Sequence, residues 1–256
     1  MTTIHPTALV DKKAHLGDNV SVGAFAIIEA DVEIGDGTTI ASHALVADGA
    51  RIGKDCKIHN GAVVSTVPQD LKFGGEKTLF NIGDNTTIRE FCTLNRGTHE
   101  SGASTVGSNC LLMAYVHVGH DCAIGNDVII ANSVQCGGHV HIDDHAIIGG
   151  MVGIHQFSRI GQHVMVGGGF RITKDVPPYI LAMGEPLRFA GINSVGLRRR
   201  GFQPDVLSAL KKTYRILYRS KLNVSQAVAR IKEDVEMLPE VENIVHFIEK
   251  AERGLL

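Results

Sequence analysis

An aliphatic residue or cysteine recurs at every sixth position along the first two thirds of the chain. The register starts at Ile4 and ends at Ile172, and 26 of its 29 positions hold Ile, Leu, Val or Cys. A helix would repeat its apolar positions every three or four residues, and an ordinary strand every two. A six-residue period is typical of parallel strands wound into a coil in which each hexad forms one side. The pattern therefore predicts an all-β parallel β-helix with three sides, so that three hexads complete one coil.

The three positions that break the register fall in two short segments. Asp70 and Glu76 lie in the first segment, and Glu100 lies in the second. Insertions in repeat proteins project as loops and often carry the binding face. The sequence thus predicts loops near residues 68–78 and 97–104, with an inert surface excursion as the alternative for each.

The register ends at two adjacent prolines, Pro177 and Pro178, which disfavour strand pairing. We expect a β-helical domain over residues 1–190 and a C-terminal α-helical domain over residues 191–256.

Three segments of the C-terminal part have helical spacing. The first opens at Pro204, the second covers residues 225–237, and the third begins at Pro239. Isolated amphipathic helices are marginally stable, so these helices are expected to pack on the last coil or on a neighbouring subunit.

Histidines are concentrated in the middle of the register. With three hexads per coil, Gly138 and Gln156 lie one and two coils beyond His120, while His139 and His155 are each one step away from those positions. Paired coils are separated by about 4.8 Å. The three histidines are therefore predicted to line one corner, with polar decoration of a turn as the alternative.

An acid, Asp121, directly follows His120. An imidazole can accept a proton near neutral pH, and a carboxylate can orient it. Gly138 lies at the same corner, so its N–H could stabilise an oxyanion during acyl transfer. Adjacent side chains seldom hydrogen-bond to each other, which leaves the role of Asp121 open. His145 and His163, also one coil apart, are expected to stack at a different corner in a structural role.

Composition and charge narrow the function class. The net charge of −2 offers no electrostatic basis for nucleic-acid binding. From Arg188 to Lys221, nine Lys or Arg accompany a single acid, which suits an anionic partner or a solvated helix face. The five cysteines form no C-x-x-C pair and favour a reducing compartment. No apolar run is long enough for a signal peptide or a transmembrane segment, so we expect a cytoplasmic protein.

Several longer motifs resemble one enzyme family. They are QDLKFGGE at 69–76, HVGHDC at 117–122, GGHV at 137–140, IGGMVGIHQF at 148–157, DVPPY at 175–179 and GLRRRGF at 196–202. Together with the hexads they resemble the bacterial UDP-N-acetylglucosamine 3-O-acyltransferase family, which catalyses the first step of lipid A biosynthesis. The likeness covers essentially the whole chain. It implies a left-handed β-helix, a sense that periodicity alone does not provide.

The resemblance also implies a reaction and its site residues. A (3R)-3-hydroxyacyl chain would pass from acyl carrier protein to the 3-hydroxyl of UDP-N-acetylglucosamine, with His120 as general base. By the same match, Asp121 orients His120 and the Gly138 amide faces the oxyanion. No cofactor and no metal are implied. The substrate-binding positions match Asp70, Lys72, His117, His139, His155 and Gln156, with Asn193, Arg199 and Arg200 near the UDP end.

Two positions bear on how far this resemblance extends. Asn95 stands where the family carries a histidine, which leaves the role of that position open. Gly168 falls where the family measures acyl length, and its small size favours a deep groove and a long chain. The family further implies a homotrimer with sites between subunits, which suits the flat faces of a triangular prism.

Three other functions share parts of the pattern. An N-acyltransferase acting on a UDP-amino sugar has the same repeats, but it is expected to carry an additional N-terminal domain, whereas here the register begins at Ile4. A zinc hydratase resembling the γ-class carbonic anhydrases needs a third histidine five residues after His155, where the chain has Ile160. A non-catalytic scaffold would leave the histidine corner, Asp70 and Lys72 without a shared purpose. The sequence therefore favours O-acyl transfer.

Overall fold

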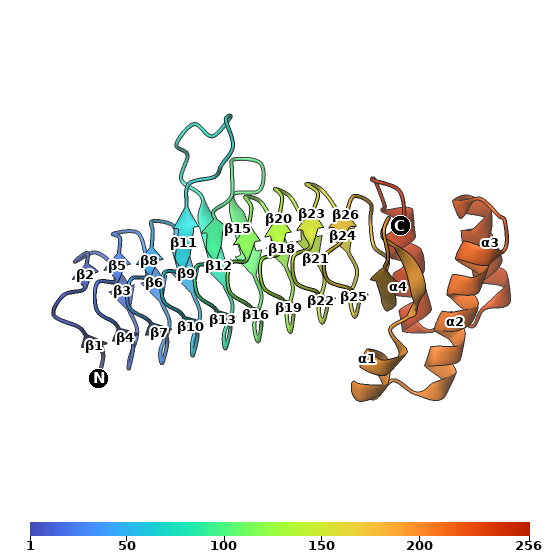
Figure 1. Cartoon of the computed structure of the whole chain (residues 1–256), viewed down its shortest axis with the longest axis horizontal. Coiled ribbons are helices and arrows are strands. Elements are labelled where there is room, and N and C mark those ends of the chain that lie inside the picture. Colours follow the sequence, from blue (N-terminus) through green and yellow to red (C-terminus); the bar gives the residue numbers. More distant parts are fainter.

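The computed structural model describes residues 1–256 and contains a long prism of short parallel strands (Figure 1). Each coil of the chain adds one strand to each of three sheets. Thr3 pairs with Ser21, three hexads later, and Leu9 pairs in the same way with Ile27 in the next sheet. The three-sided parallel β-helix predicted from the six-residue register is therefore confirmed.

The three sheets, named A, B and C, follow one another around the prism, and all their strand pairs are parallel except β27 with β28. Sheet A contains β1 (Thr3–Ile4), β4 (Ser21–Val22), β7 (Thr39–Ile40), β10 (Lys57–Ile58), β13 (Thr87–Ile88), β16 (Leu111–Leu112), β19 (Ile129–Ile130), β22 (Ile147–Ile148), β25 (Met165–Val166), β27 (Ile180–Met183) and β28 (Arg188–Ile192). Sheet B contains β2 (Leu9–Val10), β5 (Ile27–Ile28), β8 (Leu45–Val46), β11 (Val63–Thr66), β14 (Thr93–Asn95), β17 (His117–Val118), β20 (Gln135–Cys136), β23 (Gly153–Ile154) and β26 (Arg171–Ile172). Sheet C contains β3 (His15–Leu16), β6 (Glu33–Ile34), β9 (Ala50–Ile52), β12 (Leu79–Ile82), β15 (Ala103–Val106), β18 (Ala123–Ile124), β21 (His141–Ile142) and β24 (Arg159–Ile160).

The interior of the prism takes two residues from most hexads. One is the large aliphatic residue of the register, such as Ile130, which is fully buried. The other lies two positions earlier at the corner and is small, as at Val128 and Cys122. Interiors are close-packed, so a narrow corner admits only small side chains. All five cysteines are buried and free.

Most corners turn at a residue with positive φ, three positions before the residue of the register. At the corner between sheets B and C these residues include Asp121, His139 and Phe157, with φ of 58°, 59° and 65° in successive coils. Asp, Asn and His are the non-glycine residues that adopt this conformation most readily. The register thus stacks three side chains of different chemistry in one column at this corner.

Two coils are longer than the others. Arg51 pairs with Asn81, five hexads later, and Asn81 pairs with Thr105, four hexads later. An ordinary coil has three hexads, so the insertions add two hexads and one hexad. Because each insertion is a whole number of hexads, the register stays in phase.

The added residues form two loops, 67–78 and 96–102, which project from the corner between sheets B and C (Figure 1). Ala103 and Ser104, which the sequence assigns to the second loop, belong to β15.

Beyond β26 the chain forms a hairpin and four helices. β27 extends sheet A, and β28 pairs with it in antiparallel fashion, an addition that the sequence did not predict. The helices are α1 (Ser194–Arg199), α2 (Pro204–Arg219), α3 (Val224–Asp234) and α4 (Pro239–Glu249). None of them combines the length and apolar character needed to cross a membrane.

The helices pack on the last coil of the same chain. The Tyr214 hydroxyl on α2 donates to the Pro178 carbonyl, and Asn243 on α4 donates to the Tyr179 hydroxyl at 3.2 Å. The Arg159 guanidinium of β24 lies 4.8 Å from the ring centroid of Phe247 on α4. These contacts cover the open end of the coil, whose unpaired backbone groups would otherwise face water.

Candidate active site

His120 and Asp121 are adjacent in the chain and hydrogen-bonded to each other. His120 Nδ1 lies 2.7 Å from Asp121 Oδ2. Neighbouring side chains of a strand point to opposite faces, but these residues occupy a corner, and Asp121 has a φ of 58°. The left-handed turn brings the two side chains together, which is why a contact that is rare between neighbours forms here.

The Asp121 carboxylate is buried and fully hydrogen-bonded. Its side chain is 0% exposed, whereas that of His120 is 16% exposed. Oδ1 accepts from the Thr98 backbone N–H at 2.8 Å and from the Ser101 hydroxyl, and Oδ2 accepts from Thr98 Oγ1 at 2.9 Å and from His120. Burial raises the pKa of Asp121, but the hydrogen bonds from Ser101, His120 and Thr98 outweigh burial and bring it to about 2. Asp121 is thus an anion at neutral pH, which places the His120 proton on Nδ1 and leaves Nε2 free.

The far edge of the His120 ring lies against Gly138, one coil further along. A Cβ at residue 138 would lie 2.6 Å from both Nε2 and Cε1 of His120, so only glycine leaves this ring in place. The Gly138 N–H donates to no protein acceptor. Asn126 occupies the equivalent position, two residues after the register residue, at the corner between sheets C and A. Its backbone N–H is paired, because it donates to Asp144 Oδ1 at 2.6 Å. An unprotonated Nε2 therefore adjoins a glycine whose N–H is free to bind an oxyanion.

His139 continues the column from Asp121. Its ring meets His120 edge to face at a centroid distance of 5.1 Å and stacks on Phe157 at 4.4 Å. His139 Nε2 lies 3.6 Å from Asp121 Oδ2 and 3.4 Å from Glu100 Oε2 of the second loop. The column thus links the His120 corner to the next two coils through aromatic contacts.

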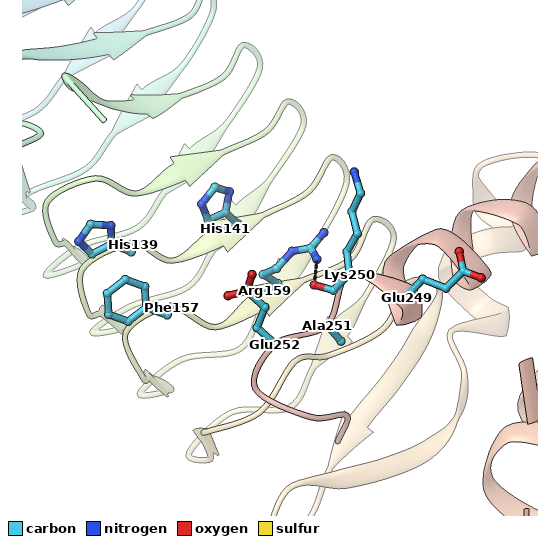
Figure 2. Close-up of a pocket in the computed structure, with 8 residues that line it drawn as sticks. All are labelled: His139, His141, Phe157, Arg159, Glu249, Lys250, Ala251 and Glu252. Carbon is cyan, nitrogen blue, oxygen red and sulfur yellow. Dashed lines mark hydrogen bonds between the residues drawn. The ribbon is translucent and has the colours of Figure 1, made fainter. Parts of the chain in front are cut away.

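A pocket of about 450 Å³ lies beside this column, with His139 and Phe157 on one side and the segment after α4 on the other (Figure 2). Arg159 reaches across it and donates to the Lys250 carbonyl at 2.8 Å. Glu249 points away from the pocket and pairs instead with Lys232 at 2.9 Å. The Arg159 bond therefore ties the segment after α4 to sheet C along this pocket.

His155 turns away from the column. It lies with His117 along a groove of about 440 Å³ on the outer face of sheet B. Gly153 also lines this groove, and the groove is open there, because a Cβ at Gly153 would meet nothing within 4 Å. His117 Nδ1 lies 2.8 Å from Thr93 Oγ1, and burial lowers the pKa of His117. The register does bring the three histidines to one corner, but their side chains divide between the column and the groove.

One atom each of His120, Asp121 and His139 lie within 4.8 Å of one another, a spacing that could hold a metal ion. The group fits a metal poorly, because each carboxylate oxygen of Asp121 already accepts two hydrogen bonds and has no lone pair left. His155, the second histidine of the zinc-hydratase pattern, is not a member of the group. The geometry therefore favours a hydrogen-bonded dyad over a zinc site.

Asp70 and Lys72 lie in loop 67–78, and no hydrogen bond or ion pair joins them to the His120 corner of the same chain. The Asp70 carboxylate accepts from the Lys72 backbone N–H at 3.0 Å, and the Lys72 side chain is exposed. Gln156 is exposed at the same corner step as His120, two coils further on.

Asn193, Arg199 and Arg200 lie at the corner between sheets C and A, away from His120. The Asn193 side chain caps α1 by accepting a backbone N–H at 3.2 Å and donates to the His163 carbonyl at 3.0 Å. Arg200 contacts His145 Nδ1 at 2.6 Å, and Arg199 is exposed. The predicted stack of His145 on His163 is present, with a centroid distance of 4.6 Å.

Two further positions singled out in the sequence lie outside the His120 corner. Gly168 is at the corner between sheets A and B, where a Cβ would lie 3.0 Å from the Gly150 carbonyl oxygen. Asn95 is buried, and its amide donates to Thr66 Oγ1 and to the Val67 carbonyl, both at 3.0 Å. Asn95 thus anchors the base of loop 67–78, a structural role for the position that the sequence left open.

Three residues of the second loop, Thr98, Glu100 and Ser101, were not identified as site residues from the sequence. A signal was available: the one-hexad insertion lies at the same corner as His120 and one coil before it. Its length and place in the coil therefore put this loop beside Asp121.

Comparison with known proteins gives one consistent family. A family model described as UDP N-acetylglucosamine O-acyltransferase, domain 2, matches residues 175–256, and a model of bacterial transferase hexapeptide repeats matches residues 13–48 and 103–138. An acyl-(acyl-carrier-protein) UDP-N-acetylglucosamine O-acyltransferase of Chlorobaculum parvum is 58% identical over 255 residues, which cover 99% of this chain and 97% of that protein. A protein of the same name from Thiobacillus denitrificans is 43% identical over 257 residues, with 100% of both chains covered.

Solved structures agree with the sequence relatives. The UDP-N-acetylglucosamine acyltransferase of Bacteroides fragilis superimposes with a TM-score of 0.98 at 46% identity, over 99% of this chain and 100% of that one. The corresponding structure from Acinetobacter baumannii gives a TM-score of 0.96 at 42% identity, over 99% of each chain.

Proposed function

The chain belongs to the UDP-N-acetylglucosamine O-acyltransferase family, and from this premise we propose how its His120 corner performs the reaction. The protein is an acyltransferase that moves a (3R)-3-hydroxyacyl chain from acyl carrier protein to the 3-hydroxyl of UDP-N-acetylglucosamine, the first step of lipid A biosynthesis. The observation that carries the mechanism is the His120–Asp121 dyad lying over Gly138.

His120 is the general base in this mechanism. Its Nδ1–H donates to Asp121, so Nε2 holds the lone pair that takes the proton of the sugar 3-hydroxyl. Asp121 remains an anion throughout and stabilises the imidazolium that forms, as a buried carboxylate does for a catalytic histidine elsewhere. This division of roles needs no metal and no covalent enzyme intermediate.

Transfer then proceeds through a tetrahedral intermediate. The sugar oxygen bonds to the thioester carbonyl carbon as its proton passes to Nε2, and the Gly138 N–H stabilises the negative charge on the carbonyl oxygen. Collapse of the intermediate breaks the carbon–sulfur bond, and the proton passes from His120 to the leaving sulfur. The products are the sugar ester and the free thiol of the carrier protein.

The substrate-binding part of the proposal involves more than one chain. Asp70 and Lys72 lie on a loop that projects from the prism, and nothing in their own chain engages the Lys72 side chain. We propose a homotrimer in which this loop reaches the His120 corner of a neighbouring subunit. The groove that holds His117 and His155 would then face the substrates between the two chains.

An apolar ridge supports this association. Phe25, Phe91, Tyr115 and Met151 occupy equivalent steps of the corner between sheets A and B, and their exposures are 57%, 52%, 57% and 73%. Phe91 and Tyr115 stack at 5.3 Å. Exposed apolar side chains that gather along one corner are typical of interaction surfaces in soluble proteins, and neighbouring copies of the prism would cover this corner.

Three broader features belong to the same proposal. The hexapeptide repeats and the solved relatives support the left-handed sense of the coil. Four helices between Ser194 and Glu249 support a C-terminal helical domain after a β-helical one that ends near residue 190. Five free, buried thiols suit the cytoplasmic location expected from the sequence.

The proposal is tested with purified protein, UDP-N-acetylglucosamine and a ladder of 3-hydroxyacyl carrier proteins, with mass spectrometry of the sugar nucleotide. We expect one acyl group per sugar and a preferred chain length. His120→Ala should lower kcat by about 100- to 10,000-fold, the usual contribution of a general base, with an unchanged circular dichroism spectrum. Product only with a 3-amino sugar would favour the N-acyltransferase, and folded protein inactive on both acceptors would contradict acyl transfer.

A further inference from the structure

The second loop, 96–102, supplies most of the hydrogen bonds that hold Asp121. Of the four bonds on the carboxylate, three come from Thr98 and Ser101, and only one comes from His120. The same loop carries Glu100, whose carboxylate lies 3.4 Å from His139 Nε2. The loop therefore covers the dyad from the side that faces the preceding coil.

The loop is also held by contacts that do not involve Asp121. The Gly102 N–H donates to the Thr98 carbonyl at 2.8 Å, and the Gly97 N–H donates to the Leu79 carbonyl at 3.1 Å. The base is pinched, because a Cβ at Gly97 would lie 2.5 Å from the Ala103 nitrogen. These contacts help to hold the donors of the loop in place in addition to the bonds with Asp121.

Other coils show what the corner is like without such a loop. His139 and Phe157 occupy the same corner position as Asp121, but the coil before each of them carries no inserted loop at this corner. The side chain of His139 is 18% exposed, against 0% for that of Asp121. The whole residue is 47% exposed at Phe157 and 4% exposed at Asp121. The one-hexad insertion is therefore what buries Asp121 and surrounds it with donors.

We propose that Thr98 and Ser101 are positioning residues of this acyltransferase, which fix the Asp121 carboxylate and through it hold the His120 ring with Nε2 over Gly138. The inference rests on the proposed function and extends it to residues that act through Asp121. A carboxylate with a single partner can rotate about its side-chain bonds, and His120 would then lose its defined orientation. The low pKa of Asp121 agrees with this role, because the donors keep the carboxylate ionised despite its burial.

The test compares the steady-state kinetics of Thr98→Val and Ser101→Ala, singly and together, with those of the wild type. Each single variant should lower kcat about 10-fold and the double variant about 100-fold, since a hydrogen bond to a charged group contributes roughly 1.5 kcal/mol or more. The KM values for sugar nucleotide and acyl carrier protein should stay within about twofold, because both hydroxyls are directed at Asp121. Thr98→Ser, which keeps the hydroxyl, should restore most of the activity.

The split between kcat and KM separates positioning from general stability. In the double variant kcat should fall while both KM values stay within about twofold, and circular dichroism should show an unchanged fold. Ser104→Ala is the matched control, because the Ser104 hydroxyl is buried without a partner and lies just beyond the loop. Its kinetics should equal those of the wild type.

Two results would overturn the inference. One is a kcat within twofold of wild type for both single variants, and the other is a lowered kcat that Thr98→Ser does not restore. Wild-type protein measured in the same series distinguishes a failure of the proposed function from a failure of this inference. Inactive wild type contradicts the proposed function itself, whereas active wild type with indifferent variants contradicts only the role of the loop.

Discussion

The imidazole ring of His120 occupies the space that a side chain at Gly138 would fill. A Cβ built on Gly138 lies 2.6 Å from Nε2 and Cε1 of that ring, and no backbone atom is among its nearest contacts. The φ of Gly138 is not in the left-handed region, so the backbone itself accepts any L residue. Glycine is required here by the neighbouring ring and not by the turn.

Gly138→Ala is therefore expected to lower activity far more than stability. The added methyl group pushes aside the end of a partly exposed ring, which costs little folding free energy, but it moves Nε2 and crowds the N–H that faces the oxyanion. We expect kcat to fall about 100-fold or more, as for loss of an oxyanion donor, with a melting temperature within a few degrees of wild type. Retention of more than a third of the wild-type kcat would contradict the assigned geometry.

The second histidine stack predicts how stability depends on pH. His163 is buried between His145 and Tyr179, and its Nδ1 has no hydrogen-bond partner. Burial first, then the neighbouring His145 and Arg200, lower the pKa of His163 to about 4. A histidine in the unfolded chain titrates near 6.5, so between these values the unfolded state binds more protons. The contribution of His163 is complete above about pH 6.5 and is lost as the pH falls toward 4.

His163→Phe keeps the stack and removes the titration. Between pH 7 and pH 5 the free energy of unfolding of the wild type should fall by about 1 to 2 kcal/mol more than that of the variant. Urea denaturation at both pH values measures the difference. Equal pH dependence in the two proteins would show that His163 does not titrate across this range.

The proposed sites between subunits predict complementation of inactive chains. His120→Ala and Lys72→Ala are each expected to be nearly inactive as homotrimers. After denaturation and refolding as an equal mixture, about a quarter of the sites combine an intact His120 with an intact neighbouring loop, if assembly is random. Activity should then recover to about a quarter of the wild-type value, whereas a site formed within one chain would show no recovery.

The proposed role of Gly168 predicts that the size of residue 168 sets the preferred length of the acyl chain. A side chain placed there cannot turn toward the preceding coil, because its Cβ already lies 3.0 Å from the Gly150 carbonyl oxygen, so it must project outward from the corner of sheet B. Gly168→Met should shorten the preferred acyl chain in the carrier-protein ladder and keep kcat on the shorter donor near the wild-type optimum. An unchanged length preference would place the end of the acyl groove elsewhere.

The C-terminal part shows where sequence patterns stop being sufficient. The segments that begin at Pro204 and Pro239 carry amphipathic spacing and a proline at the helix start, and both form helices there. The hairpin of β27 and β28 was not predicted, because β28 pairs antiparallel and lies outside the six-residue register. Helix α1 has only six residues and depends on the Asn193 cap and on its contacts with the last coil.

The sequence by itself determined the prism and the place of the candidate site on it. A six-residue period sets which residues face the interior and, through coils of three hexads, which residues share a corner, so Gly138 could be placed beside His120 by counting. This works because each coil repeats the previous one by translation, and position along the axis follows from residue number alone.

Only the tertiary structure decided how the side chains at that corner are directed. The contact between Asp121 and His120 depends on a positive φ, and the burial of Asp121 depends on a loop inserted one coil earlier in the chain. His155 shares the corner but turns into the groove of sheet B. Periodicity specifies where each Cα lies, whereas side-chain direction follows from local backbone conformation and from contacts between coils, which a repeat does not encode.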